Sequence, residues 1–177
     1  MQTAFRTTVW LGAGVSIDAY HMSDGTCRYG LRYVSQLFGH QKNYYSRLLK
    51  LLGTKKDPKK LKALLDKGFT GYKIAVKVLN DSGRGAAKPE TISFDDFCLI
   101  ADHEAYVDKN PKAQALYSAS FRELLRSRTR NAFGLPEDTL EQKQLEFQFN
   151  YQHYLEDRAE LNDLKLPGDE VYHPEFN

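Results

Sequence analysis

A glycine at position 39 separates two apolar segments that both repeat with the period of an α-helix. The apolar residues of these segments are Leu31, Val34, Leu37 and Phe38 before the glycine, and Tyr44, Tyr45, Leu48, Leu49 and Leu52 after it. Glycine tolerates the positive φ that a tight turn requires, and Ser35 is small enough for two helices to cross closely. Residues 30–53 therefore predict two short helices joined by a turn, which is the arrangement of a helix-turn-helix.

The second of these helices predicts a surface that reads double-stranded DNA. An arginine can bind the edge of guanine through two hydrogen bonds, and an asparagine can do the same for adenine, so we expect Arg47 and Asn43 to contact bases. Lysines contact phosphates, which position a protein without specifying a sequence. The predicted DNA-binding residues are Lys42, Asn43, Tyr44, Ser46, Arg47, Lys50, Lys55, Lys56, Lys59, Lys60, Arg84 and Lys88. A plain helical hairpin with a polar outer face is the structural alternative.

The distribution of charge favours the same function, because the formal net charge of +2 hides two regions of opposite sign. Residues 42–88 contain thirteen Lys or Arg and three Asp or Glu. Residues 135–177 contain three Lys or Arg and eleven Asp or Glu. A basic stripe is typical of nucleic-acid binding, since each neutralised phosphate releases condensed counterions. A solvated lysine-rich surface would show the same pattern without binding DNA.

The rest of the sequence predicts an α+β protein with a small antiparallel sheet. Period-two alternation indicates a strand within residues 8–21, an Asp-Gly turn follows at 23–26, and a short strand follows around 27–29. Strands at 72–79 and 90–93, on either side of a flexible basic loop, have the layout of the wing in a winged-helix protein. Further helices are expected at about 58–67, 93–106, 110–133 and 139–163.

We expect two regions in this fold, an N-terminal helix-turn-helix or winged-helix-like domain (1–92) and a helical C-terminal region (93–177). Small DNA-reading proteins gain affinity and specificity by pairing on two half-sites, so the C-terminal helices are predicted to form a homodimer. Arg122 and Arg126 share one helix face, and we expect them to pair with the acidic last helix rather than to contact phosphates. The apolar face expected on that last helix consists of Leu140, Phe147, Tyr151, Tyr154 and Leu161.

The stretch from Trp10 to Ser16, with glycines at positions 12 and 14, resembles the turn that opens sirtuin-like NAD-binding domains. Such a fold requires a helix after Ser16 and a large parallel sheet. The turn at 23–26 leaves too little room for that helix. We therefore expect no cofactor, and a strand in which Gly12 or Gly14 relieves a bulge or a close approach.

A Mg²⁺-dependent DNA nuclease of the restriction or homing type is the enzyme alternative, because this reaction requires clustered carboxylates and a nearby lysine. The candidate residues are Asp18, Asp24, Asp81, Asp95, Asp96, Lys73 and Lys77. Asp95 and Asp96 are better explained as first-turn carboxylates of a helix that Ser93 caps, so we predict no catalytic residue and no metal site. Residues expected at the surface or at helix caps include Asp102, His103, Glu104, His21 and His40.

The cysteine content and the hydropathy bound the environment of the chain. Cys27 and Cys98 are too few for a disulfide scaffold or a thiolate zinc site. No apolar run approaches the roughly 20 residues that a membrane helix needs, and the N-terminus lacks the pattern of a signal peptide. These features favour a soluble cytoplasmic protein without a membrane partner.

The order of these segments resembles that of a known group of proteins. The quoted segments are "DGTCRYGLRYVSQLFG", a basic helix, "GFTGYKIAVKV", "TISFDDF" and "LLRSRTRNAFG". Over residues 12–135 they resemble uncharacterised bacterial proteins common in cyanobacteria, which are similar in layout to the KilA-N and Bro-N DNA-binding modules of phage antirepressors. This resemblance implies DNA binding and a regulatory role, and it implies nothing firm about catalysis.

Overall fold

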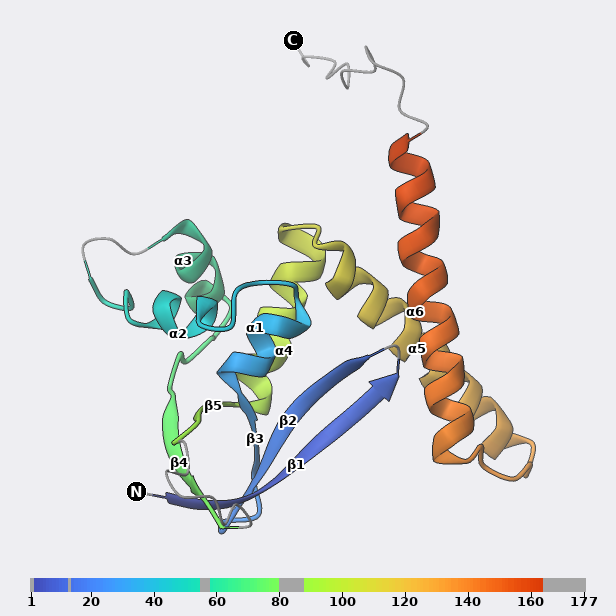
Figure 1. The fold of residues 1–177 in the computed structure, drawn as a ribbon, viewed down its shortest axis with the longest axis horizontal. Helices are drawn as coiled ribbons and strands as arrows, with labels where there is room; N and C mark the ends of the chain where they lie inside the picture. Colours follow the sequence, from blue (N-terminus) through green and yellow to red (C-terminus); the bar gives the residue numbers. More distant parts are fainter. Residues whose placement is uncertain (1, 13, 55–57, 80–87, 164–177) are drawn as a thin grey trace.

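The fold is described by a computed structural model over residues 2–12, 14–54, 58–79 and 88–163 (Figure 1). The strands are β1 (Gln2–Gly12), β2 (Val15–Met22), β3 (Cys27–Gly30), β4 (Ile74–Val78) and β5 (Glu90–Ser93). The α-helices are α1 (Leu31–Leu37), α2 (Tyr44–Leu49), α3 (Lys59–Asp66), α4 (Phe94–Asp102), α5 (Pro111–Ala132) and α6 (Leu140–Asp163), and a π-helical turn η1 (His103–Val107) follows α4. The predicted α+β class with a small, mainly antiparallel sheet is confirmed.

The five strands form a small closed barrel in the order β1-β2-β3-β5-β4. Neighbouring strands are antiparallel except β1 and β4, which run parallel from the pair Gln2↔Val76 to the pair Ala4↔Val78 and thereby close the barrel. β4 and β5 pair with each other, but β4 also pairs with β1 and β5 with β3, so the described strands do not form a separate two-stranded wing. The predicted wing tip, residues 80–87, lies outside the described residues.

The N-terminal segment forms a long β-hairpin, so the prediction of one strand within residues 8–21 is wrong. β1 runs to Gly12 and β2 begins at Val15, which makes the glycine-rich stretch the connection between two antiparallel strands. A strand rather than a helix continues after Ser16, and the sirtuin-like interpretation therefore fails. The pairing register shifts between Trp10 and Gly12, as expected for a bulge.

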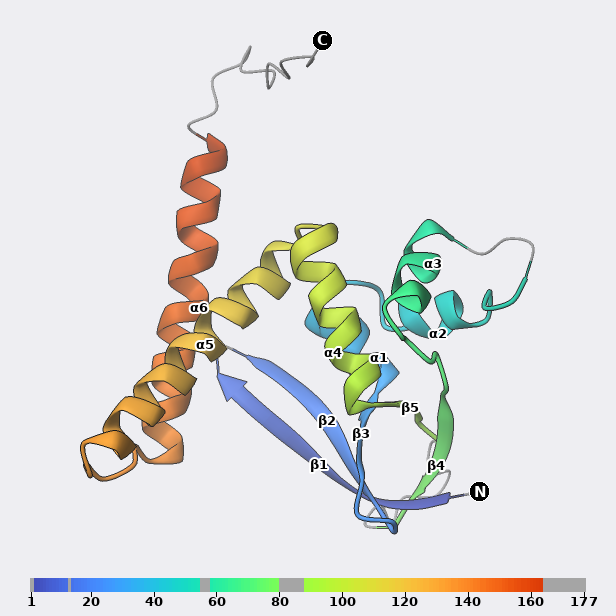
Figure 2. The same ribbon diagram turned by 180° about the vertical axis from the view of Figure 1, so that it is seen from behind.

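Gly12 also permits a close approach between the hairpin and the last helix. Its φ is +118°, and a Cβ atom at this position would lie 2.6 Å from the backbone oxygen of Gln144 in α6. The side-chain amide of Gln144 donates a hydrogen bond to the carbonyl oxygen of Trp10 at 3.3 Å. Both ribbon views show the tip of the hairpin beside α6, at the opposite end of the molecule from α2 and α3 (Figures 1 and 2).

The two helices predicted around position 39 are present as α1 and α2. Gly39 has a φ of +79°, a conformation that favours glycine. Ser35 is fully buried where the helices cross: its hydroxyl donates to the carbonyl oxygen of Leu31 at 2.8 Å and accepts from the backbone N–H of Tyr45 at 3.2 Å. The small side chain thus allows the close crossing and satisfies an N–H group at the start of α2.

The starts of two later helices follow signals that are local in the sequence. The hydroxyl of Ser93 accepts from the backbone N–H of Asp96 at 3.1 Å, and the side-chain oxygen of Asn110 accepts from the N–H of Lys112 at 3.0 Å. Both are N-cap hydrogen bonds of the predicted kind. The helix that Ser93 caps does not continue as a regular α-helix, because it becomes π-helical at His103.

The main hydrophobic core crosses the predicted boundary between residues 92 and 93. It joins Leu31 and Val34 of α1 and Tyr45 of α2 with Ile100 of α4 and Ala113 of α5, all of them fully buried. The α1–α2 pair therefore depends on α4 and α5 for its packing.

α5 and α6 pack through a second cluster, in which Ala119 of α5 lies with Phe147 and Tyr151 of α6. The apolar face predicted for α6 is confirmed at Phe147 and Tyr151, but it is wrong at Leu140, which is 71% exposed. The side chain of Leu161 lies outside the described residues. Within the described ranges, no helix is both long enough and apolar enough to cross a bilayer.

Candidate nucleic-acid interface

Helix α2 has two different surfaces because its apolar residues fall on one side. Tyr45 and Leu48 are buried against the core. Arg47 and Lys50 are exposed, and so is Lys42 in the turn that precedes the helix. Three of the cations predicted to contact DNA therefore lie at the solvent side of a helix that the core holds in place.

The other residues predicted to contact DNA from this region lie towards neighbouring elements. Tyr44 stacks on His40, with ring centroids 4.2 Å apart, and the Nζ of Lys60 lies 5.5 Å from the centre of the Tyr44 ring. Asn43 and Ser46 line a pocket between α2 and the barrel. The predicted reading surface is thus divided between open solvent, a stacked aromatic pair and a pocket.

Exposed basic side chains lie in and beside α2 and α3, and others lie on β4 and before β5. Of the described cations between residues 42 and 88, only Lys60 and Lys73 form ion pairs with described carboxylates. Lys55, Lys56 and Arg84, which the sequence also assigned to DNA contact, lie outside the described residues. The exposed cations without such an ion pair are Lys42, Arg47, Lys50, Lys59, Lys62, Lys67, Lys77 and Lys88.

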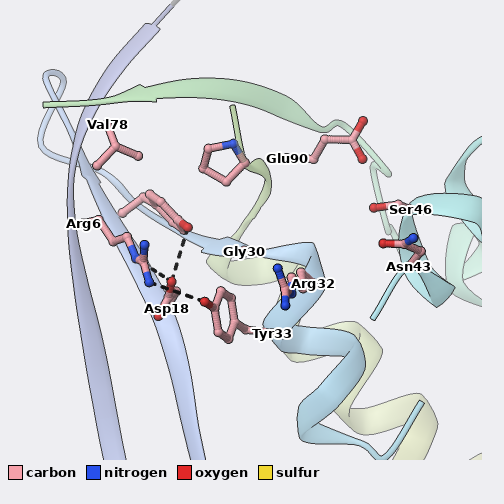
Figure 3. Close-up of a pocket in the computed structure, with 11 residues that line it drawn as sticks. Arg6, Asp18, Gly30, Arg32, Tyr33, Asn43, Ser46, Val78 and Glu90 are labelled. Carbon is pink, nitrogen blue, oxygen red and sulfur yellow. Dashed lines mark hydrogen bonds and ion pairs between the residues drawn. The ribbon is translucent and has the colours of Figure 1, made fainter. Parts of the chain in front are cut away.

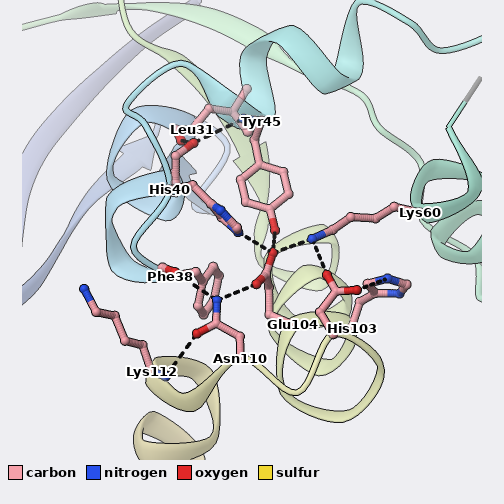
Figure 4. A network of polar contacts seen from close by, with 11 residues as sticks. Leu31, Phe38, His40, Tyr45, Lys60, His103, Glu104, Asn110 and Lys112 are labelled. Carbon is pink, nitrogen blue, oxygen red and sulfur yellow. Dashed lines mark hydrogen bonds and ion pairs between the residues drawn. The ribbon is translucent and has the colours of Figure 1, made fainter.

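Lys60 belongs to a buried polar network centred on Glu104 in η1 (Figure 4). The Oε1 atom of Glu104 accepts hydrogen bonds from His40 Nε2 at 2.7 Å, from the Tyr45 hydroxyl and from Lys60 Nζ. Its Oε2 atom accepts from Asn110 Nδ2 at 2.7 Å. One carboxylate, only 1% exposed, thus connects the turn after α1, helices α2 and α3, and the cap of α5.

The charges in this network are stabilised mainly by one another, because solvent has little access. Burial raises the pKa of Glu104, but hydrogen bonds from Lys60, Tyr45, His40 and Asn110 outweigh it and lower the pKa to about 2. Burial lowers the pKa of Lys60, yet hydrogen bonds to Asp108 and Glu104 raise it above its ordinary value. The Nζ of Lys60 lies 2.6 Å from Asp108 Oδ2, and the side chain is 13% exposed. The ammonium group is therefore directed at two carboxylates of its own chain.

The expectation that His103 and Glu104 lie at the surface or at caps is wrong, since they are 2% and 1% exposed. His40 is not isolated either, because it contacts Glu104. The physical reason is the π-helical turn, which directs both adjacent side chains inward. One signal was present in the sequence: Glu104 follows the core residue Ile100 by four positions, which places both on the same helix face.

A polar pocket of about 270 Å³ opens between α2 and the barrel (Figure 3). Asp18, which is 1% exposed, lies in its wall and is held by Arg6 at 2.6 Å and by the Thr8 hydroxyl at 2.9 Å. Asn43 and Ser46 form the wall on the side of α2. The pocket therefore brings together residues from the sheet and from the predicted reading helix, a juxtaposition that no local sequence pattern indicates.

The carboxylates considered for a nuclease are engaged at separate places. Asp18 pairs with Arg6 of β1, whereas Asp96 accepts hydrogen bonds from the backbone N–H and the hydroxyl of Thr70, at 2.8 and 2.7 Å. Asp81 lies outside the described residues. In the ranges that the structure covers, no three His, Cys, Asp or Glu side chains are grouped so that they could hold a metal ion.

Two arginines of α5 pair with acidic residues of the same chain, as the sequence predicts for Arg126, whereas Arg122, expected to pair in the same way, forms no ion pair with a described carboxylate. Arg126 lies 3.2 Å from Asp138 and 3.0 Å from Glu146. Arg130 also contacts Asp138, at 3.4 Å. These ion pairs connect α5 to the start of α6.

No family model, curated protein or solved structure matches this chain in comparisons of sequence and of fold. Function is therefore inferred from the arrangement of the residues themselves. The most prominent feature is the set of exposed cations in and beside α2 and α3, where buried contacts hold the helices in place.

Proposed function

We propose that the protein binds double-stranded DNA through a helix-turn-helix-like unit formed by α1, the turn at Gly39 and α2. The observation that carries this proposal is the set of eight exposed cations between residues 42 and 88 without described ion pairs, six of which lie in or beside α2 and α3. Like charges that are grouped in this way repel one another, and a polyanion relieves the repulsion while releasing its own counterions. The resemblance in layout to KilA-N and Bro-N modules supports the same function, in a regulator that recognises a particular sequence.

The proposed complex places the exposed side of α2 in the major groove. Arg47 then contacts a base edge, because its guanidinium matches guanine. Lys42, Lys50 and Lys59 neutralise phosphates on either side of the groove. Lys60 acts indirectly, since its ion pairs with Glu104 and Asp108 hold α3 in position.

This function is tested by comparing Arg47→Ala with Lys59→Ala on a duplex selected from a random library and on a random duplex. We expect Arg47→Ala to reduce the preference for one base pair by about 1–3 kcal/mol. Lys59→Ala should weaken binding to both duplexes alike. It should also reduce by about 1 the salt slope, which is the slope of the logarithm of the binding constant against the logarithm of the salt concentration. Equal losses for Arg47→Ala on the two duplexes contradict its role in reading bases. A wild-type protein without salt-dependent duplex binding contradicts DNA binding itself and favours an adaptor that binds proteins.

The nuclease alternative is separated from binding by incubating the protein with plasmid and Mg²⁺. Asp95 is the carboxylate to replace in this test, because it is exposed in the first turn of α4. The neighbouring Asp96 is buried and accepts a hydrogen bond from the backbone N–H of Thr70. Nicking that persists through purification and disappears in Asp95→Ala would replace the binding-only function with an enzymatic one.

We also propose that α5 and α6 hold two copies of the protein together. Several exposed apolar residues of α5 point away from its contact with α6. Positions 121, 124 and 125 follow Ala119, a residue of that contact, by two, five and six residues, which places them on other sides of the helix. Monomeric soluble proteins rarely expose contiguous apolar patches larger than a few hundred Å². The exposed apolar residues are Phe121, Leu124 and Leu125 on α5, and Leu145 and Phe149 on α6, with exposed fractions from 50% to 68%.

The flanking charges favour a second copy as the molecule that covers these residues. Arg122 and Arg128 lie beside the exposed apolar residues of α5, whereas Glu141 and Glu156 lie beside those of α6. The same chain therefore carries a basic apolar surface and an acidic apolar surface that suit one another. A dimer formed in this way would present two α2 helices to one duplex.

A further inference from the structure

The charges around the pocket beside α2 sum to +1 when Lys73, which pairs with a pocket carboxylate from outside the lining, is counted with Arg6, Arg32, Asp18 and Glu90. Asp18 is paired with Arg6 at 2.6 Å, and Glu90 is paired with Lys73 at 2.6 Å. These are the two carboxylates among the described residues that line the pocket. Arg32 lines it as well, is exposed, and forms no ion pair with any described carboxylate. The guanidinium of Arg32 is therefore a cation without a counterion in this space.

A neutral donor faces the same space from the other helix. Asn43 lines the pocket on the α2 side, opposite Arg6 and Asp18 of the barrel (Figure 3). A guanidinium and an amide are a common donor set for the oxygens of a phosphate group. The volume of about 270 Å³ is below the roughly 300–1,000 Å³ of typical ligand pockets. The pocket thus suits one small anionic group and its nearest atoms rather than a whole cofactor.

The negative charge of Glu90 is balanced by Lys73, which weakens its repulsion of an anion in this pocket. Burial raises the pKa of Glu90, but hydrogen bonds from Lys73 and Ser46 and the nearby charge of Lys50 lower it below its ordinary value. The carboxylate is thus ionised at neutral pH and oriented by its own partners.

We propose that this pocket is a phosphate-binding subsite, in which the Arg32 guanidinium and the side-chain amide of Asn43 hold one phosphate group. Arg32 supplies the charge and two N–H groups in a planar fork, and Asn43 supplies one N–H donor. This assignment changes the role that the sequence predicts for Asn43, from reading an adenine to positioning a phosphate.

The phosphate group can come from two sources. In the first, it is a phosphodiester of the DNA that lies along α2, so this source rests on the proposed function. In the second, it belongs to a free phosphorylated molecule of mononucleotide size. Such a ligand would connect α1 with α2 and would alter the affinity for DNA.

The test compares wild-type protein with Arg32→Gln and Asn43→Ala in two measurements. Fluorescence anisotropy of a labelled duplex at several salt concentrations gives the salt slope of DNA binding. NMR titration without DNA, using inorganic phosphate and a deoxynucleoside monophosphate, reports shifts of the side-chain signals of Arg32 and Asn43. Lys109→Gln is the control, because it removes an exposed cation that neither lines the pocket nor belongs to the surfaces proposed to bind DNA or a second copy.

If DNA supplies the phosphate, Arg32→Gln reduces the salt slope by about 1, Asn43→Ala weakens all duplexes alike, and Lys109→Gln changes neither. If a free molecule supplies it, the mononucleotide shifts the signals of the wild-type pocket and has no effect in Arg32→Gln. A slope unchanged by Arg32→Gln together with no response to either anion overturns the subsite. Failure of the wild-type protein to bind DNA contradicts the proposed function alone, and the NMR titration then decides the subsite.

Discussion

We expect the buried carboxylate of Glu104 to make the stability of the fold sensitive to acid. Its pKa is about 2 in the folded protein and 4.5 ordinarily. A carboxyl group whose pKa is lower in the folded state contributes stability above its unfolded pKa, and this contribution is lost as the pH falls through the folded pKa. The contribution of Glu104 is therefore complete at neutral pH and disappears between about pH 4.5 and about pH 2.

Replacing Glu104 by glutamine tests this dependence. We expect Glu104→Gln to lower the free energy of unfolding at pH 7 by roughly 3 kcal/mol, because it leaves buried donors without their charged acceptor. The difference from wild type should shrink as the pH falls below about 4.5 and be smallest below about pH 2, where Glu104 is protonated in the folded protein as well. Urea denaturation at a series of pH values measures it, with the exposed Glu141→Gln as control. A difference that is independent of pH would contradict the depressed pKa of Glu104.

Two glycines in one connection allow backbone strain to be separated from steric contact. Gly12 and Gly14 both have positive φ, but only Gly12 is packed against another element, with Gln144 O at 2.6 Å from an added Cβ. We expect Gly14→Ala to cost about 1–2 kcal/mol for its conformation alone. Gly12→Ala should cost more, because the hairpin must also move away from α6. Thermal unfolding of the two variants compares them, and equal losses would show that the contact between hairpin and helix is loose.

At the scale of elements, the contact between α1 and α2 depends on the hydroxyl of Ser35. Ser35→Ala keeps the volume small but leaves the backbone N–H of Tyr45 without its acceptor at 3.2 Å. An unsatisfied buried donor costs about 1–3 kcal/mol, so chemical denaturation should show a loss in this range. Ser23→Ala, at an exposed turn, is the control and should have almost no effect. If the two variants are equally stable, the hydrogen bond between the helices contributes nothing.

The elements that the sequence predicts well are those whose signals are local. Helices α1 and α2 follow from apolar spacing and from Gly39, and the start of α4 follows from the cap at Ser93. The sequence predicts one strand in place of the β1/β2 hairpin because Val9 and Trp10 at the end of β1, although exposed, form one continuous apolar pattern with the buried residues of β2. This pattern gives no sign of the connection after Gly12.

The candidate site was less predictable because its contacts are distant in the sequence. His40 and Glu104 are separated by 64 residues, and Lys60 and Glu104 by 44. Periodicity describes one element at a time and carries no information about which elements meet. The exposed lysines are identified from composition, whereas the inward direction of Lys60 depends on its contacts with Glu104 and Asp108, which are distant in the sequence.

At the scale of the molecule, the exposed apolar residues of α5 and α6 predict a dimer that charge can disrupt. We expect Phe149→Glu to convert the wild-type dimer into a monomer, because it places a carboxylate in an apolar contact. Light scattering coupled to size-exclusion chromatography measures the mass, and Leu79→Glu, at an exposed site after β4, is the control. A wild-type protein that is monomeric at micromolar concentration would contradict the dimer.

The tip of the β1/β2 hairpin contacts α6, one of the helices proposed to join two copies, while Arg6 and Asp18 from its two strands line the pocket beside α2. In the proposed dimer, the hairpin would therefore act together with the main core as a spacer between two α2 helices. Two residues added to each strand lengthen it by about 7 Å, which corresponds to about two base pairs along a duplex. A change in this ribbon would shift the preferred distance between half-sites while leaving the bases read at each half-site unchanged, so that operator spacing and operator sequence could evolve through different parts of the chain.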